Sequence, residues 1–385
     1  MKNYHLKIPS SLFGGENSVE KIGDILKNEK IKNAIVFTDK GIKMSGLTDI
    51  ILKEIEKVNV SYEIFDNLIP EPSYKDVENV MNDIKNYDGD IIIAIGGGSV
   101  MDVAKLCTVL KNAPYTIKDL LKDPSIAHKK IKSIMIPTTC GTGSEATCNA
   151  IVAIPEDETK VGIVNNDLIP DYVILDPRMI KSLPKSIIAS TGVDALAHCV
   201  ECLTSKKANP FSDLYSLNGG KLIFENIRLA YLYPNDRRAK ENMLIGAFYG
   251  GIAITASGTT AVHALSYPLG GKFHIPHGIS NAIIFAQVME FNKNACLEQF
   301  SRLCDLINPS YANKSKEEKA DYIISEIKDI VKVTEIPTNI SKYGVQLSDI
   351  DFLVNSASQI TRLLNNNLKV LSLDDIKNIY LKILS

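Results

Sequence analysis

The stretch "IAIGGGSVMDVAK", residues 93–105, joins an apolar run to three glycines and then to a helical segment. The longer run "DIIIAIGGGS" (90–99) is typical of a buried strand that ends in a turn, and "VMDVAKLCTVLKN" (100–112) reads as the helix that follows. Glycines let a backbone approach a pyrophosphate closely, and a helix start offers unpaired N–H groups and a positive dipole end. The stretch therefore predicts a phosphate-binding turn at the end of a strand.

This turn is only a partial dinucleotide fingerprint, because Gly96 and Gly98 fit G-x-G while Met101 stands in the place of the third glycine. Ser99 and Asp102 allow two interpretations. They either cap the helix together, as in a capping box, or contact a cofactor directly. A second glycine turn, "PTTCGTGSE" (137–145), follows another strand and is rich in hydroxyls. Two such turns at strand ends predict a phosphate site.

Strand-like and helical segments alternate through the first half of the chain. This alternation predicts a parallel sheet covered on both faces, with ligands bound beyond the carboxyl ends of its strands. The strand-like segments are 33–41, 61–67, 90–99 and 132–139, and the helical ones are 47–58, 74–87 and 100–112. Less regular strands follow up to Pro177, and from Leu183 onward the spacing is helical. We therefore expect a boundary near 178–183, with an α/β domain over 1–180 and an all-helical domain over 181–385.

Composition excludes several function classes. A net charge of −2 over 385 residues provides no electrostatic basis for binding nucleic acid or an anionic membrane. No run reaches the ~18 apolar residues of a membrane span, and the start of the chain lacks the apolar core of a signal peptide. Seven cysteines, an odd number, favour reduced thiols and a cytoplasmic location. Cys199 and Cys202 have CxxC spacing but lack a second pair, so we interpret them as packed thiols.

Three of the six histidines fall within "HALSYPLGGKFHIPHG" (263–278). This segment either binds a metal with help from other ligands, or is a Gly/Pro-rich turn that holds histidines by chance. "TGVDALAHCVE" (191–201) places Asp194 and His198 four residues apart on one helix face, where they form either half of a metal site or a structural pair. Together with His263 and His277 they offer one carboxylate and three imidazoles, which suit a first-row divalent metal.

Two further carboxylates have open roles. Glu201 shares the helix face of Asp194 and His198; we expect a solvated charge there rather than a partner of a metal ligand. Asp39 ends the strand-like segment "NAIVFTD". It either accepts hydrogen bonds from an adenosine ribose and repels a 2′-phosphate, or simply shapes the turn before Gly41.

Four motifs in order, GGGSVMDVAK, PTTCGTGSEAT, TGVDALAHCVE and HALSYPLGGKFHIPHG, resemble the iron-containing (group III) alcohol dehydrogenase family. The likeness runs from about Phe13 to the C-terminus. It implies an N-terminal α/β nucleotide-binding domain with a Rossmann-like parallel sheet and an all-α C-terminal metal-binding domain. Metal and nicotinamide are then expected in the cleft between the two domains.

The resemblance also implies site residues. Asp194, His198, His263 and His277 match the metal ligands of that family, with Fe²⁺ as the expected ion and Zn²⁺ as the alternative. The positions that match NAD contacts are Asp39, Gly97, Gly98, Ser99, Asp102, Thr138, Thr139, Thr142, Asn149, Lys160 and Met179. Many members carry a second histidine where this chain has Tyr267. The nearest uncoordinated imidazole is then that of His274, which is either a proton relay or a turn histidine.

Within the family, the HALSYPLGG-x-x-H-x-PHG pattern and "RLLNNN" (362–367) look most like clostridial 4-hydroxybutyrate dehydrogenases. The likeness implies a cytoplasmic homodimer or higher homo-oligomer that interconverts small primary alcohols and aldehydes by hydride transfer to NAD. Arg362 then binds a substrate carboxylate, or else is a surface arginine paired with an acidic neighbour.

The alternative enzyme is a glycerol or 1,3-propanediol dehydrogenase-type polyol oxidoreductase. A non-catalytic nucleotide-binding module is the alternative from another class, and the complete set of four ligands argues against it.

Overall fold

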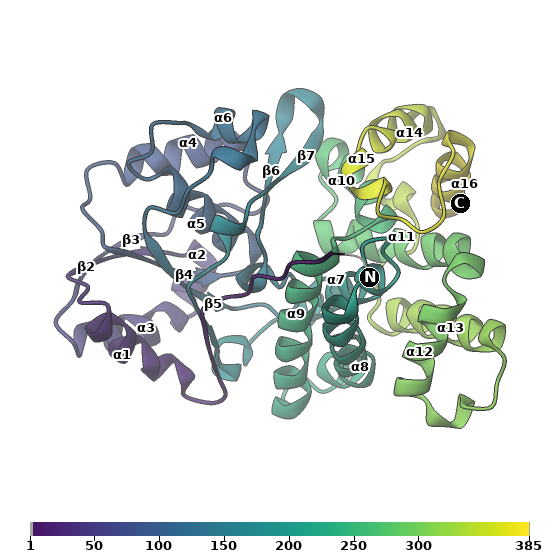
Figure 1. The fold of residues 1–385 in the computed structure, drawn as a ribbon, viewed down its shortest axis with the longest axis horizontal. Helices are drawn as coiled ribbons and strands as arrows, with labels where there is room; N and C mark the ends of the chain where they lie inside the picture. Colours follow the sequence, from purple (N-terminus) through teal and green to yellow (C-terminus); the bar gives the residue numbers. More distant parts are fainter. Residues whose placement is uncertain (1–2, 385) are drawn as a thin grey trace.

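The computed structural model describes residues 3–384, which form an α/β region and a helical region side by side (Figure 1). The last strand of the α/β region ends at Leu175, and the first long helix of the helical region begins at Lys185. The division that we predict at residue 180 lies in the connection between them.

A six-stranded parallel sheet forms the centre of the α/β region, as the alternating segments predict. Its strand order is β1-β8-β5-β4-β2-β3. The strands are β1 (Ser11–Gly14), β2 (Asn33–Phe37), β3 (Ser61–Phe65), β4 (Ile91–Gly96), β5 (Lys132–Pro137) and β8 (Tyr172–Leu175). All six residues of β4 are buried, which explains why this strand reads as a continuous apolar run.

Helices cover both faces of the sheet, and successive side chains of β4 enter different cores. Ile91, Ile93 and Ile95 pack in one core with α1 (Lys21–Asn28) and α3 (Leu47–Glu56). Ile92 and Ala94 pack in the other core, with α4 (Tyr74–Asp83), α5 (Gly98–Leu110) and α6 (Ile117–Lys122). The short helix α2 (Lys40–Met44) follows β2 directly. This arrangement confirms the predicted fold class.

Two of the irregular strands lie outside the six-stranded sheet. β6 (Asn149–Ile154) and β7 (Thr159–Val164) pair with each other as an antiparallel hairpin. The hairpin contacts α5 on one side and α10 of the helical region on the other. It therefore connects the α/β region with the helices that carry the metal-ligand candidates.

The helical region has one large apolar core, to which most of its helices contribute. Its helices are α7 (Lys185–Leu203), α8 (Pro210–Leu232), α9 (Arg237–Ser257), α10 (Ala261–Phe273), α11 (His277–Asn292), α12 (Leu297–Ile307), α13 (Lys316–Val333), α14 (Ile350–Ser358), α15 (Thr361–Leu364) and α16 (Leu373–Leu384).

Helix α7 passes through the middle of this region. Within residues 3–384 it is the one helix whose length and composition alone would allow it to cross a membrane, yet 78% of its apolar window is buried in the protein. Helices α9 and α10 meet the same criterion only as a pair, and they are bent by 105° at their junction. Burial inside the protein accounts for the apolar character of α7.

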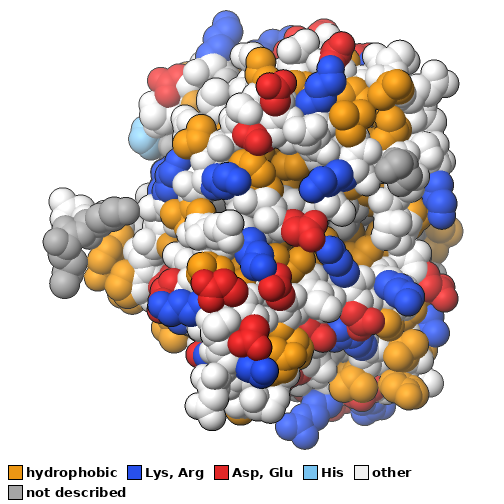
Figure 2. Space-filling view, turned by 90° about the vertical axis from the view of Figure 1, so that its right-hand side faces the viewer, with side chains coloured by type: hydrophobic (Ala, Val, Ile, Leu, Met, Phe, Trp, Pro, Cys, Tyr) orange, Lys and Arg blue, Asp and Glu red, His pale blue; other side chains and the backbone are white. Residues whose placement is uncertain are grey.

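The outer face of the C-terminal helices carries mixed charges. Figure 2 shows lysines and arginines interspersed with aspartates and glutamates over this face. Exposed pairs such as Lys316–Glu298 and Lys377–Asp351 account for part of the mixture. An interspersed surface of this kind lacks the extended positive field that nucleic-acid binding uses.

Candidate active site

A cavity of about 750 Å³ lies where the carboxyl ends of the strands face the helical region. Its lining includes both glycine turns, the β6–β7 hairpin and the starts or ends of α7, α10 and α11. All of the sequence-predicted cofactor residues line it: Asp39, Gly97, Gly98, Ser99, Asp102, Thr138, Thr139, Thr142, Asn149, Lys160 and Met179.

The four predicted metal ligands converge at one end of this cavity. Asp194 and His198 lie on α7, His263 lies in the first turn of α10, and His277 is the first residue of α11. One donor atom from each of them lies within 4.8 Å of all the others. The 263–278 segment is thus neither a simple turn nor a simple helix, because Pro268 lies within α10 and a tight turn precedes α11.

The distances within this metal-ligand cluster suit a single ion. Asp194 Oδ1 lies 3.6 Å from His198 Nε2, 3.7 Å from His263 Nε2 and 3.8 Å from His277 Nε2. For comparison, tetrahedral metal–ligand bonds of about 2.1 Å would separate the ligand atoms by about 3.4 Å. The cluster therefore has nearly the dimensions of a coordination shell.

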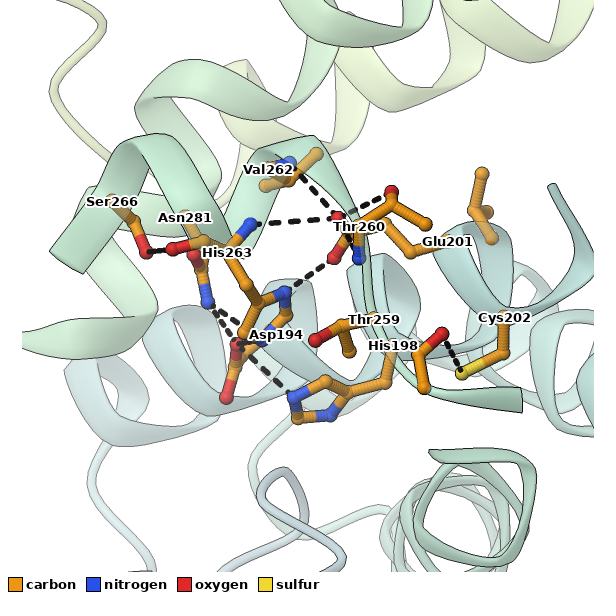
Figure 3. A network of polar contacts seen from close by, with 12 residues as sticks. Asp194, His198, Glu201, Cys202, Thr259, Thr260, Val262, His263, Ser266 and Asn281 are labelled. Carbon is orange, nitrogen blue, oxygen red and sulfur yellow. Dashed lines mark hydrogen bonds and ion pairs between the residues drawn. The ribbon is translucent and has the colours of Figure 1, made fainter. Parts of the chain in front are cut away.

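Asn281 provides an independent test of whether a cation fits. Its fully buried Nδ2 lies 2.6 Å from Asp194 Oδ1 and 3.2 Å from His263 Nε2 (Figure 3). It also lies 3.2 Å from His277 Nε2. One amide has two N–H protons, so it cannot satisfy three acceptors, and its own Oδ1 has no partner. The cluster contains more lone pairs than protein donors, which is the condition that a bound cation relieves.

Burial and neighbouring charges together shift the pKa values of the ligands. Burial lowers the pKa of His198, and it lowers the pKa of His277 to about 3. Burial alone would raise the pKa of Asp194, but the charges of the surrounding imidazoles outweigh it and lower the pKa. Neutral imidazoles and an ionised carboxylate are the forms that coordinate a metal.

Glu201 is the clearest correction to the sequence-based expectation, because it is fully buried rather than solvated. Its Oε1 accepts hydrogen bonds from Thr260 N at 2.9 Å, Thr260 Oγ1 at 2.7 Å and Val262 N at 2.9 Å, and its Oε2 pairs with His263 Nδ1 (Figure 3). Burial opposes the ionised form of Glu201, but the pair with His263 outweighs this and lowers the pKa of the carboxyl.

The same pair orients His263. Burial alone would lower the pKa of His263, but the Glu201 carboxylate outweighs it and raises the pKa. When Nδ1 donates to Glu201, the imidazole directs Nε2 toward Asp194, as in carboxylate–histidine–metal arrangements. The spacing of Glu201, three residues after His198 on α7, was the signal for this role.

The two glycine turns are tied together by buried charges. Asp102 accepts hydrogen bonds from Ser144 Oγ and from Ile151 N at 2.9 Å, and it forms an ion pair of 3.0 Å with Lys105. Lys105 is fully buried and donates to Ser144 O and Thr147 Oγ1, each at 3.0 Å. This role of Lys105 was missed, because a lysine on a helix pattern is normally exposed.

The capping interpretation of Ser99 and Asp102 is wrong. The N-cap of α5 is Gly97, which lies one residue outside the helix and has no side chain to cap it. Ser99 Oγ instead accepts a hydrogen bond from Glu71 N at 3.0 Å. Thr138 and Thr139 have buried hydroxyls without a partner, so both can hydrogen-bond to a ligand in the cavity.

The position of Asp39 is compatible with both of its predicted roles. Its Oδ1 accepts a hydrogen bond from Ile42 N at 2.9 Å, which caps α2, and the residue also lines the cavity. The turn interpretation and the ligand interpretation are therefore compatible.

Tyr267 and Arg362, which we predict at the catalytic and substrate sites, both line the cavity. Tyr267 is buried, its ring centroid lies 6.2 Å from that of His277, and Arg362 lies near its hydroxyl. Gly162 on β7 leaves room for the guanidinium, because a Cβ there would lie 2.8 Å from an Arg362 nitrogen. Arg362 is exposed, but among residues 3–384 no carboxylate forms an ion pair with it, so the acidic neighbour of the surface-pair interpretation is absent.

His274 does not reach the site. It is exposed at the C-terminal cap of α10, with a φ of 53°, and it does not line the cavity. The structure thus places it as a turn histidine, and the proton-relay interpretation has no geometric support.

Comparisons with known proteins agree with this geometry. The family model "Iron-containing alcohol dehydrogenase" matches residues 9–177, and the model "Fe-containing alcohol dehydrogenase family, C-terminal" matches residues 188–384. A 4-hydroxybutyrate dehydrogenase from Clostridium kluyveri is 35% identical over 322 residues, which cover 81% of this chain and 84% of that protein.

Two solved structures show the same fold along the whole chain. A 1,3-propanediol oxidoreductase has a TM-score of 0.94 at 26% identity and covers 99% of this chain and 100% of its own. A sulfoacetaldehyde reductase from Bifidobacterium kashiwanohense, in complex with NAD⁺, has a TM-score of 0.89 at 26% identity, with 100% of both chains covered. This chain therefore belongs to the family of iron-containing alcohol dehydrogenases.

Proposed function

We propose that this protein is a metal-dependent NAD(H) oxidoreductase that interconverts small primary alcohols, 4-hydroxybutyrate in particular, with their aldehydes. The observation that carries the proposal is that one cavity contains the four-ligand cluster, both glycine turns and the guanidinium of Arg362.

Asp194, His198, His263 and His277 would hold the metal, because their donor atoms lie within 4.8 Å of one another. A divalent ion held there supplies Lewis-acid chemistry to the substrate oxygen and lowers the pKa of the alcohol. Glu201 holds His263 in the orientation that this requires. The ligand types allow both Fe²⁺ and Zn²⁺, and we propose Fe²⁺ on the basis of the family.

The glycine turns and Asp39 would bind the nicotinamide cofactor, which supplies hydride transfer when bound. The N-terminus of α5 offers N–H groups to a pyrophosphate, and the unpaired hydroxyls of Thr138 and Thr139 lie in the same cavity. We propose NAD because the Asp39 carboxylate would repel a 2′-phosphate. The complex of the sulfoacetaldehyde reductase with NAD⁺ supports this choice.

Tyr267 would act as a hydrogen-bond donor. Burial raises its pKa, so its hydroxyl keeps the proton at neutral pH. A protonated phenol beside the cluster can hold a substrate oxygen but cannot serve as a general base.

Arg362 would bind the carboxylate of a hydroxy acid. Its guanidinium offers two parallel donors, and no carboxylate of the described chain neutralises it. The similarity to the 4-hydroxybutyrate dehydrogenase of Clostridium kluyveri supports this substrate class.

A polyol oxidoreductase is the second candidate, favoured by the structural likeness to a 1,3-propanediol oxidoreductase. A neutral polyol has no group that needs an arginine. The dependence of turnover on Arg362 therefore separates the two candidates.

The test is a substrate panel with the metal-loaded enzyme and NAD(H), monitored by NADH absorbance. The panel contains 4-hydroxybutyrate, 1-butanol, 1,3-propanediol and glycerol, with succinate semialdehyde and butanal in the reverse direction. Loss of a charge-assisted contact of about 1.5–3 kcal/mol corresponds to a roughly ten- to hundredfold change in kcat/KM. We expect Arg362→Ala to lower kcat/KM by this factor for 4-hydroxybutyrate and succinate semialdehyde. The loss for 1-butanol and butanal should be far smaller.

Arg302→Ala is the matched control, because Arg302 is a surface arginine that pairs with Asp213 at 2.7 Å. It should leave the whole panel unchanged. Equal losses of Arg362→Ala on acids and neutral alcohols, or no turnover of the acids by the unmodified enzyme, would contradict the hydroxy-acid assignment.

We further propose that the enzyme works in the cytoplasm as a homodimer or higher homo-oligomer. All seven cysteines are free and buried, which is compatible with a reducing compartment. Size-exclusion chromatography with light scattering would measure the oligomeric state directly.

A further inference from the structure

Glu71 lies between β3 and α4 in an uncommon backbone conformation. Its φ is 53°, in the left-handed region that costs energy for a residue with a side chain. Glu71 belongs to none of the four sequence motifs, although it lines the cavity. A strained glutamate at a cavity wall persists only where its surroundings hold it.

Three contacts hold Glu71, and each comes from a different element. Its N–H donates to Ser99 Oγ at 3.0 Å, at the start of α5. Its Oε2 forms an ion pair of 2.9 Å with Lys160 on β7. Its Oε1 accepts a hydrogen bond of 2.9 Å from the backbone N of His277, the first residue of α11.

The third contact places a carboxylate at the N-terminus of a 16-residue helix. The first N–H groups of a helix have no partner within it, and the positive end of its dipole favours a negative charge there. Glu71 thus fixes the position at which α11 begins.

His277 needs such support more than the other imidazole ligands do. Its side chain is 33% exposed, whereas those of His198 and His263 are 6% and 5% exposed. His263 is also held through its ring by Glu201. His277 has less protein packed around its ring, so its placement depends more on its backbone.

We propose that Glu71 is a positioning residue for the metal site. Its carboxylate fixes the start of α11 and so holds His277 against Asp194. Its N–H and its pair with Lys160 connect that ligand to the glycine turn and the hairpin that line the cofactor cavity. This inference rests on the metal site of the proposed function.

The test measures metal retention instead of turnover. Zinc-loaded enzyme is mixed with an excess of a chromogenic chelator, and the release rate is compared among variants. We expect Glu71→Ala to release zinc about ten- to a hundredfold faster, as for other residues that orient metal ligands. Glu71→Gln keeps an oxygen that can accept from His277 N, and should restore most of the retention.

Glu335→Ala is the matched control. Glu335 also has a positive φ of 56°, and its carboxylate accepts a hydrogen bond from the Tyr231 hydroxyl at 2.9 Å. It should release zinc at the unmodified rate. Thermal unfolding of the metal-free variants should show that Glu71→Ala is folded and no less stable than Glu335→Ala.

Two results would overturn the role of Glu71 alone. One is release of zinc from Glu71→Ala at the unmodified rate, and the other is release from Glu71→Gln as fast as from Glu71→Ala. Failure of the unmodified protein to retain zinc would instead overturn the metal site, and this proposal with it.

Discussion

At the residue scale, Asp39 caps a helix, and we propose that it also selects the cofactor. The same carboxylate caps α2 through Ile42 N, and the residue lines the cavity. The two roles can be separated, because asparagine caps helices as well as aspartate does but carries no charge.

We expect Asp39→Asn to raise kcat/KM with NADP relative to NAD by roughly fivefold, since a like-charge contact costs about 1 kcal/mol even in water-like surroundings. Steady-state kinetics with both cofactors measure this ratio. Asp236→Asn, which alters the same type of cap on α9, is the control and should leave the ratio unchanged. Equal use of both cofactors by the unmodified enzyme would show that Asp39 does not discriminate between NAD and NADP.

At the element scale, the second glycine turn contains a buried carboxyl group. Glu145 is 1% exposed, and burial raises its pKa from 4.5 to about 7. The folded state then binds this proton more tightly than the unfolded state does. The contribution of Glu145 to the free energy of unfolding is therefore present at low pH, and it is lost as the pH rises from about 4.5 to about 7.

We therefore expect Glu145→Gln to raise the free energy of unfolding at pH 8, by up to about 3 kcal/mol, and to change it little at pH 4.5. Urea unfolding at the two pH values measures the difference. Glu63→Gln, at an exposed position on β3, should show no such pH dependence. A stabilisation that is the same at both pH values would contradict the burial explanation.

At the scale of the whole molecule, the predicted metal site joins separate helices. Its ligands come from α7, α10 and α11, so an ion bound there should stabilise the folded state over the unfolded state. At a free metal concentration of about 100 Kd, the gain is about 2.7 kcal/mol, or roughly 3 °C in Tm for a chain of this length.

His277→Ala should abolish this shift and the stoichiometric metal measured by elemental analysis, while the metal-free Tm stays close to that of the unmodified protein. His128→Ala, which removes an imidazole that is 72% exposed, should keep both the shift and the metal. Stoichiometric metal in His277→Ala would show that the four-ligand assignment is wrong.

The sequence by itself determined the architecture and the chemical composition of the site. Runs such as 91–95 are apolar on both faces, which is typical of a strand in a parallel sheet covered by helices on both sides. The i, i+4 spacing of Asp194 and His198 already places them on one face of α7. These are local properties, which periodicity and residue type specify.

Only the tertiary structure decided which polar groups are buried and which residues they pair with. Glu201 meets His263 across 62 residues, and Glu71 meets His277 across 206 residues. Whether a carboxylate is solvated or buried depends on which elements pack over it, and local spacing contains no such information. For the same reason Ser99 meets Glu71 instead of capping α5, Lys105 is buried under the glycine turns, and the exposed His274 lies outside the cavity.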